Sequence, residues 1–349
     1  MTATTSKSFW ESSRDSLLKI VTSETFLYIV KRILQALLTI FLASVVSFIV
    51  IQLAPGDYLD NLRQNPKISP ERILQLQEQF GLDKPWHIQY FLWLIRVLTK
   101  GDFGTSFFYL RPVASLIWER VPATLLLAFA SLICTWAIAI PLGIFAAVKQ
   151  NRATDRILQV ISYAGQGFPS FITALLLLIF AQITTPLFPV GGMTSIYHAQ
   201  LSPLGKVLDI LWHMILPTIA LSITSFAGLQ RITRGELLDV LRQDYIQTAR
   251  AKGLPENRVI YVHALRNAIN PFITLLVFEL ASLLSGSFIA EFFFNWPGLG
   301  RLTLQAVRSQ DLYVLMASLI ITAVLLIVGN LVADLLLKVA DPRITLGKS

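Results

Sequence analysis

The stretch RITRGELLDVLRQDYIQTARAKGLPENRVIYVHALRNAINP, residues 231–271, is the longest polar interruption in the apolar second half of the chain. Helix-forming residues occupy 236–252, where apolar side chains recur at roughly every third or fourth position. Gly253 stands where a left-handed glycine ends many helices, and Pro255 cannot continue that helix but can begin another. The stretch therefore predicts a helix, a tight turn and a second helix, which closes at Asn270-Pro271.

The composition around this stretch is typical of a membrane protein. Of the 349 residues, 54% are hydrophobic and only 14% are charged, with a mean hydropathy of +0.62. A soluble domain usually carries about 25% charged residues. The net charge of +8 comes from loops between apolar runs, which favours positive-inside topology over nucleic-acid binding. Cys134 is the single cysteine, so we expect neither a disulfide nor a cysteine metal site.

Six apolar runs are long enough to cross a hydrocarbon core of about 30 Å at about 1.5 Å per residue. The first occupies 29–54, after a polar tail at 1–28, and no small-residue cleavage site follows it. The sequence thus predicts an all-α integral membrane protein with six transmembrane helices. The other five runs form a core at 121–337, followed by a tail at 338–349; they cover approximately 121–148, 157–182, 207–228, 272–294 and 313–337.

Charge asymmetry orients these spans. Three basic residues crowd 149–156 and seven lie in 231–271, whereas 183–206 carries only Lys206 and 295–312 carries two arginines. Short loops rich in lysine and arginine remain in the cytoplasm. We therefore expect the basic loops and both termini to be cytoplasmic.

Residues 55–120 form an external region after the first span. Ser69, which is followed by a proline, predicts the start of a helix, and Gly81 predicts its end. Residues 86–100 place apolar side chains along one face, but this segment is too short to span a membrane and contains Arg96. We therefore expect amphipathic helices at the membrane interface.

Two parts of the polar stretch at 231–271 resemble a known family. The strings YIQTARAKGL at 245–254 and HALRNA at 263–268 closely resemble the "EAA" loop of ABC importer permeases, in the version of the dipeptide, oligopeptide and nickel subclass. Gln247-Thr248 replaces the Glu-Ala of the general pattern, a departure usual in that subclass. The resemblance covers nearly everything after the N-terminal tail, because the subclass also carries strings such as PGD at 55–57, GLDKPWHIQY at 81–90, GDFGTS at 101–106 and DPR at 341–343.

The resemblance implies a permease subunit with the type I ABC importer fold in the inner (plasma) membrane. It implies no cofactor, and it places ATP hydrolysis in a separate subunit. The expected partners are a second, similar permease, cytoplasmic ATPases and an extracytoplasmic substrate-binding protein. Ala249 is small enough for a partner to approach closely. The residues assigned to ATPase coupling are Tyr245, Gln247, Thr248, Ala249, Arg250, Ala251, Lys252, Gly253, Leu254, His263, Arg266 and Asn267.

Several questions stay open at this level. The solute is expected to be a di- or oligopeptide, with nickel or another small solute as the alternative. An ion-coupled secondary transporter would normally show charges at the midplane and an internal repeat, and an intramembrane enzyme would need a catalytic pair. The sequence has few charges inside its spans, and neither an internal repeat nor a catalytic pair is evident.

Polar and helix-breaking residues inside the spans pose a second set of alternatives. Glu279 lies in the inner half of the fifth span, where a carboxylate costs about 2.5–3.5 kcal/mol on insertion scales. It either lines a pathway or subunit interface, or it bonds to Ser282 or a neighbouring helix. Pro141, Pro169 and Pro217 mark either simple kinks or breaks that face protein or water.

Overall fold

The computed structural model describes residues 24–340 except 54–55, 57, 64–67 and 269, and its regular elements in that part are all helices. Residues 1–23 of the predicted tail at 1–28 and the DPR string lie outside the described residues, and residues 24–28 of that tail are instead the start of α2. The helices are α2 (Glu24–Leu53), α3 (Tyr58–Arg63), α4 (Pro70–Phe80), α5 (Trp86–Lys100), α6 (Val113–Val148), α7 (Ala153–Gly167), α8 (Ser170–Ile183), η1 (His198–Gln200), α9 (Pro203–Leu241), α10 (Asp244–Ala251), α11 (Glu256–Arg258), η2 (Val259–Ala264), α12 (Leu265–Ala268), α13 (Asn270–Phe293), α14 (Leu299–Arg308) and α15 (Leu312–Ala340).

Four helices of the described chain are individually long and apolar enough to cross a membrane, and they lie in α2, α6, α9 and α15. The pair α7 and α8 passes the same test jointly, which gives up to five spans. Helix α13 covers most of the run expected to be the fifth span. An all-helical membrane protein is therefore confirmed, while the expected count of six is a finer statement than these helices establish.

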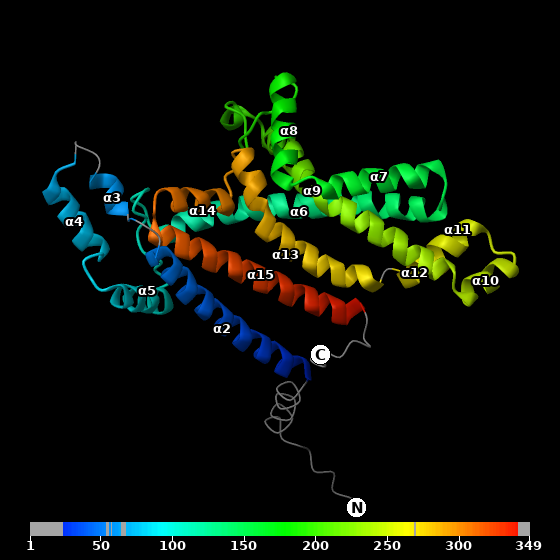
Figure 1. Ribbon diagram of the computed structural model, residues 1–349, viewed down its shortest axis with the longest axis horizontal. Coiled ribbons are helices and arrows are strands. Elements are labelled where there is room, and N and C mark those ends of the chain that lie inside the picture. Colours follow the sequence, from blue (N-terminus) through cyan, green and yellow to red (C-terminus); the bar gives the residue numbers. More distant parts are fainter. Residues whose placement is uncertain (1–23, 54–55, 57, 64–67, 269, 341–349) are drawn as a thin grey trace, which may run out of the picture.

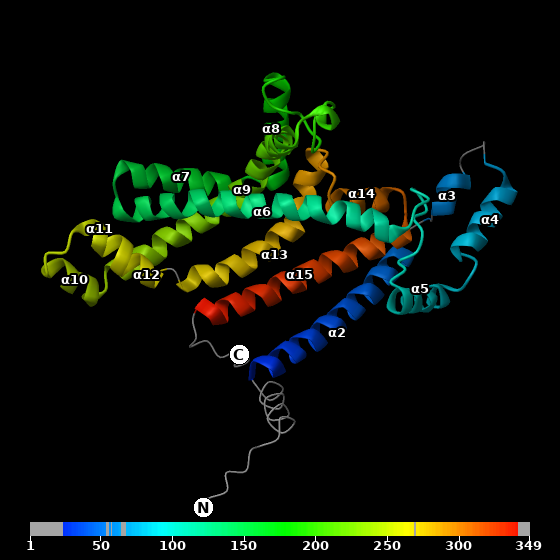
Figure 2. The same cartoon turned by 180° about the vertical axis from the view of Figure 1, so that it is seen from behind.

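The long helices lie side by side and separate two sets of short ones (Figure 1). Helices α3, α4 and α5 gather at one end of the molecule, and α10, α11 and α12 gather at the other. The view from behind shows the same arrangement (Figure 2). We call these the α5 end and the α10 end.

The local signals at α4 are confirmed. The Ser69 hydroxyl accepts a hydrogen bond from the Arg72 backbone N–H, and Gly81 takes the left-handed conformation with φ of 69°. A serine cap satisfies an N–H that has no partner within the helix, and glycine adopts positive φ without a clash of Cβ. Both signals act within a few residues of one another, which is why the sequence is sufficient to predict them.

The predicted helix at 236–252 is wrong as a single element. Its first part is the end of α9, and its second part is α10, with a break at Arg242 and Gln243, where the backbone of Gln243 is extended. The break turns α10 so that Ile246 packs against Leu237 of α9. Burial of this apolar contact outweighs the local helix propensity that favoured a continuous helix.

The prolines behave differently from one another. Pro169 precedes α8 with an extended backbone, and α7 and α8 meet at 102°. The predicted span at 157–182 is therefore bent sharply and is not one straight helix. Pro141 and Pro217, in contrast, lie inside the continuous helices α6 and α9. Proline removes a backbone donor in each case, but only the break before α8 redirects the chain.

Candidate functional site

A hydrophobic cluster fixes the 244–268 segment against the ends of α6 and α9. Ile246 is completely buried in it and Ala249 is 7% exposed. The segment is thus a packed part of the fold, although its sequence is polar. The buried members are Ile144, Ala147, Leu237, Leu238, Ile246, Ala249, Val259, Ile260, Ala264 and Ala268.

Helix α10 presents its remaining side to the outside. The two buried residues are three positions apart and define one face of the helix. Tyr245 is 45% exposed on this outer side. The exposed residues of α10 are Asp244, Tyr245, Gln247, Thr248, Arg250 and Ala251, and Lys252 immediately after the helix is also exposed.

Ala249 does not lie on this exposed side. We expected its small size to permit close approach of a partner, but the structure places it in the protein's own core. A larger side chain at 249 would therefore disturb the packing of α10 on α9 before it touched any partner. This expectation is corrected, and the exposed face of α10 is the surface that remains for a contact.

The turn after α10 follows the sequence prediction. Gly253 has a φ of +74°, and a Cβ built there would have no heavy atom within 4 Å. The Gly253 N–H donates to the Arg250 carbonyl at 2.9 Å, and Leu254 is half-buried beneath the turn. The conformation, and not crowding, is what favours glycine at this position.

An ion pair crosses this turn. Arg250 donates from Nη2 to Oε1 of Glu256 at 2.7 Å and from Nε to Oε2 at 3.2 Å. The bonded guanidinium lowers the pKa of the Glu256 carboxyl below its ordinary value. The side chains are 36% and 53% exposed, so solvent screens much of the attraction.

The second part of the predicted coupling stretch is less regular than expected. Residues 259–264 form a π-helix, a rare geometry that leads directly into α12. Asn267 donates its side-chain amide to the His263 carbonyl at 2.9 Å, and Arg266 is exposed. The expected end of the second helix at Asn270 is instead the start of α13.

Polar contacts that sequence analysis missed tie α7 to α9 beside this segment. Asp155 is completely buried and accepts two hydrogen bonds from Arg234, at 2.6 and 2.8 Å. About two turns farther along α7, the Ser162 hydroxyl donates to the Gln230 side chain at 2.6 Å. Nothing in the local sequence distinguishes Asp155 from a solvated residue of a basic loop. Its partner is 79 positions away.

A buried carboxylate near the end of α13 was also missed. Glu291 is completely buried near the end of α13 and holds the start of α14. It accepts hydrogen bonds from the Thr124 hydroxyl at 2.8 Å and from the backbone N–H groups of Gly300 and Arg301 at 2.7 and 3.2 Å. A Cβ at Gly298 would lie 2.2 Å from this carboxyl, so the turn accommodates only glycine without rearrangement. An acidic residue in the last turn of an apolar run was the available signal.

Asp311 performs a similar task immediately before α15. It accepts from the Ser106 hydroxyl at 2.5 Å and from the Phe108 backbone N–H at 3.0 Å. Burial raises the pKa of the Asp311 carboxyl. Gly104 also packs closely on Tyr313, and a Cβ at position 104 would lie 2.9 Å from that ring. These contacts together hold the GDFGTS string to the start of α15.

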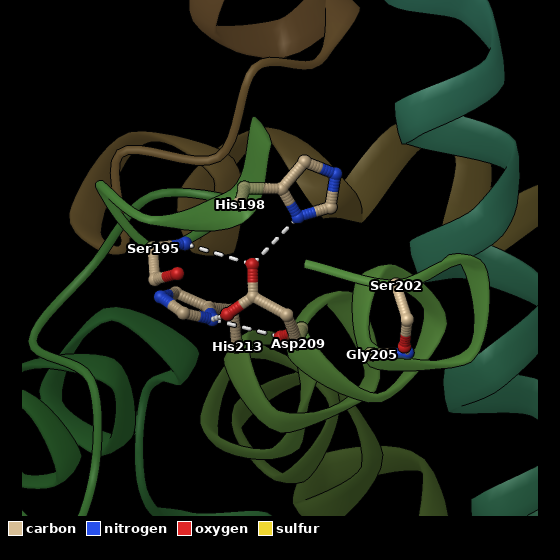
Figure 3. Close-up of polar contacts among 6 residues, drawn as sticks. All are labelled: Ser195, His198, Ser202, Gly205, Asp209 and His213. Atoms are coloured by element: carbon tan, nitrogen blue, oxygen red, sulfur yellow. Dashed lines mark hydrogen bonds and ion pairs between the residues drawn. The ribbon is translucent and has the colours of Figure 1, made fainter. Parts of the chain in front are cut away.

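A third group fastens the connection between α8 and α9 (Figure 3). Asp209 of α9 accepts from the Ser195 backbone N–H at 3.0 Å and contacts His198 Nδ1 at 2.7 Å. His213 Nδ1 lies 3.3 Å from the other carboxylate oxygen. Within the described chain, no group of three or more acidic, histidine or cysteine side chains is arranged to hold a metal ion. Through Ser195 and His198, the connection is tied to Asp209 of α9.

Glu279 is partly buried in α13. Its Oε1 atom is buried and has no hydrogen-bond partner among the described residues. Both interpretations of Glu279 therefore stay open at the level of the single chain.

Comparison with known proteins places these features in a family. Residues 139–346 match the family model described as "Binding-protein-dependent transport system inner membrane component". Residues 25–128 match the model for the N-terminal part of such membrane components. The chain belongs to this family of transport permeases. It is thus a multi-pass inner-membrane subunit of a binding-protein-dependent ABC system, which works with a binding protein and a separate ATPase and is not itself an enzyme.

Related permeases match over almost their full length. The chain is 40% identical over 318 residues to the oligopeptide transport system permease protein AppB of Bacillus subtilis (strain 168), which covers 91% of this chain and 98% of that protein. It is 35% identical over 333 residues to the dipeptide transport system permease protein DppB of Escherichia coli (strain K12), with the same coverage. It is 35% identical over 318 residues to the glutathione transport system permease protein GsiC of Salmonella typhi.

Solved structures support the fold of the permease core. An inward-facing structure of the MetNI methionine ABC transporter superposes with a TM-score of 0.54 at 16% identity. The match covers 65% of this chain and 97% of the compared chain. At this identity the likeness concerns the fold alone, which is that of an ABC importer permease.

Proposed function

We propose that this permease forms, with a second and similar permease, the membrane pathway for di- or oligopeptides. The support is the set of relatives, whose names specify oligopeptide, dipeptide and glutathione transport and which match this chain over 91% of its length. Nickel or another small solute is the alternative within the same family.

The observation that carries the mechanism is the placement of α10. This helix is anchored from below by Ile246 and Ala249, and its outer face is open at the end of the longest helix of the fold. A short helix that is rigid on one face and open on the other suits insertion into a groove of a partner. In our proposal the partner is the cytoplasmic ATPase, and residues 245–254 couple its closure and reopening to the permease.

The topology completes this proposal. Six spans result when the bent pair α7–α8 counts as one and α13, with its 24 residues, counts as another. The α10 end, which carries the basic loops, then lies in the cytoplasm with both termini. Alternating access between the two permeases would move the solute, and Oε1 of Glu279, which has no hydrogen-bond partner among the described residues, would face the pathway or the second permease.

Cysteine cross-linking of the assembled importer tests the coupling role. In a Cys134-free background, a cysteine at exposed Thr248 should cross-link to the ATPase through a short reagent. A cysteine at Ile196, which is 88% exposed between α8 and α9, should not. In the same Cys134-free background, a cysteine that replaces Asn257 should resist an impermeant label added outside intact cells. A cysteine that replaces Thr194 should react with it. Labelling of Asn257 from outside would overturn the orientation and the docking proposal together.

Uptake by proteoliposomes tests the solute. We expect ATP, and not an ion gradient, to drive accumulation of a labelled dipeptide, with competition by unlabelled short peptides. Competition by Ni²⁺ in place of peptides would favour the alternative solute. Accumulation that follows an ion gradient without ATP would contradict the whole proposal.

A further inference from the structure

Helix α5 carries an unbroken apolar stripe on its outward side. The five residues recur at helical spacing and their exposure ranges from 39% to 75%. Tyr90 and Trp93, on another side of the helix, are buried against the protein. A helix that is apolar both inward and outward is poorly suited to water on its outward side. The α5 stripe consists of Ile88, Phe91, Leu92, Ile95 and Leu98.

The neighbouring helix α4 shows that this is not a general property of the external region. The exposed residues of α4 include Glu71, Arg72, Gln75 and Glu78. Among its described side chains, Leu74 is the single exposed large hydrophobic one, at 65%. Helix α4 therefore has the surface of a helix in water, and α5 does not.

Tyr90 sets the level of α5 along the first span. Its hydroxyl lies 2.8 Å from the Ser44 hydroxyl, and its ring lies 5.3 Å from that of Phe48. Ser44 precedes the end of α2 at Leu53 by nine residues, which corresponds to about 13 Å of helix. One leaflet of the hydrocarbon core is about 15 Å thick. Tyr90 therefore meets α2 well inside the apolar run.

The polar and amphipathic residues of α5 lie where a partly immersed helix would keep them. Arg96 follows Leu92 by one helical turn and donates to the Tyr313 hydroxyl, at 3.3 Å, near the start of α15, so its charged group has a partner within the protein. Lys100 occupies the last turn, from which a long side chain can reach water. Trp86 begins the helix, and tryptophan favours the boundary between lipid and water.

We propose that the α5 stripe is immersed in the acyl chains of the adjacent leaflet. Residues of α2 at the same level along the span present an apolar surface, since Leu42, Val46 and Val50 are 52–61% exposed and recur every four residues. A soluble binding protein does not reach this level of α2, whereas acyl chains occupy it. Helix α5 thus acts as a wedge in the bilayer that holds the external region at a fixed level. This goes beyond an interfacial position, because the stripe contacts the hydrocarbon itself.

Spin labelling of the reconstituted importer tests the proposal without reference to transport. Single cysteines replace Phe91, Ile95 or Leu98 in a Cys134-free background, each carrying a nitroxide in liposomes. Molecular oxygen, which concentrates in the acyl chains, should relax these labels more strongly than a water-soluble nickel chelate does. A label at Val46→Cys on α2 should show the same preference for oxygen. Leu74→Cys on α4 is the matched control, since it is equally exposed but should favour the nickel chelate.

Each other outcome overturns the proposal. Preferential relaxation by the nickel chelate at all three α5 positions would place the stripe in water. Protection from both reagents, with an immobilised spectrum, would show that a protein partner covers the stripe. The Leu74 control separates these results from a general failure of reagent access.

Discussion

At the α10 end, the carboxylate of Asp155 is buried against the Arg234 guanidinium and also accepts from the Gln159 side chain and the Asn151 backbone N–H, whereas Glu291, near the end of α13, and Asp311, before α15, are buried against hydroxyls and backbone N–H groups. The first arrangement joins two long helices, α7 and α9. The second fixes short turns at the ends of α13 and α15. The long arginine side chain lets an ion pair connect two helices whose backbones are well separated. A carboxylate that accepts bonds from several backbone N–H groups instead determines the path of the backbone itself.

This difference matches the roles proposed for the two ends. A segment that transmits motion must be attached firmly to long helices, which the cluster beneath α10 provides, and the Asp155–Arg234 pair joins α9 in turn to α7. The α5 end must hold external loops in a defined shape, for which hydrogen bonds from uncharged hydroxyl and N–H donors to buried carboxylates are sufficient. Substitutions that remove one of these carboxylates at a time distinguish attachment through an ion pair from attachment through hydrogen bonds to the backbone.

The largest effect is expected from Glu291→Ala. The change leaves the Thr124 hydroxyl and the N–H groups of Gly300 and Arg301 without their acceptor in a closed site. We expect a loss of stability on the order of 3–5 kcal/mol, because each buried donor without a partner costs about 1–3 kcal/mol. Thermal unfolding of purified permease would measure it. Glu119→Ala is the control, since that carboxylate is about half exposed at the same end. Equal melting temperatures for the two variants would contradict the role of Glu291.

Asp155→Ala should cost somewhat less. Removal of one member of a fully buried ion pair costs about 3–5 kcal/mol, and the 18% exposure of Arg234 should reduce this to about 2–4 kcal/mol. The double variant Asp155→Ala with Arg234→Leu should recover part of the loss, since no buried cation then remains. Asp239→Ala, at an exposed position of α9, should be almost silent. A double variant less stable than Asp155→Ala would show that the pair does not act as a unit.

Gly253→Val should have a smaller and local effect. A β-branched residue resists the φ of +74°, at a cost of about 1–3 kcal/mol, although the space around the position is open. We expect normal membrane insertion with reduced co-purification of the ATPase. Gly253→Asn is the matched control, because asparagine tolerates the left-handed conformation. If valine and asparagine gave the same co-purification, the backbone conformation of the turn would not matter for coupling.

The smallest effect concerns the Arg250–Glu256 pair. Because the pKa of Glu256 is lowered in the folded protein, its contribution is present above the ordinary value of 4.5 and is lost as the pH falls through the lowered value. Glu256→Gln should therefore destabilise the turn slightly at pH 7, by less than about 1 kcal/mol for an exposed pair. Hydrogen exchange of residues 244–258, corrected for intrinsic rates, would measure this. A difference from the unsubstituted protein that persisted well below the lowered pKa would assign the effect to something other than the ion pair.

The comparison also shows which features sequence could predict. The turn at Gly253 and the capped helix α4 depend on residues within a few positions of one another, so they were predicted correctly. The break between α9 and α10 was not, because it depends on burial of Ile246 against Leu237. The orientation of Ala249 was missed for the same reason.

The sequence by itself determined that the chain is a helical membrane protein, approximately where its apolar runs lie, and that 231–271 forms a distinct polar segment. These properties follow from composition, periodicity and capping, which are local. Only the tertiary structure decided which carboxylates are buried and which side of α10 remains free. Glu291 meets Thr124 across 167 positions and Asp155 meets Arg234 across 79, so the partners that make each burial favourable are absent from any local stretch. A charge is stable inside the protein only with such partners, and the fold alone brings them together.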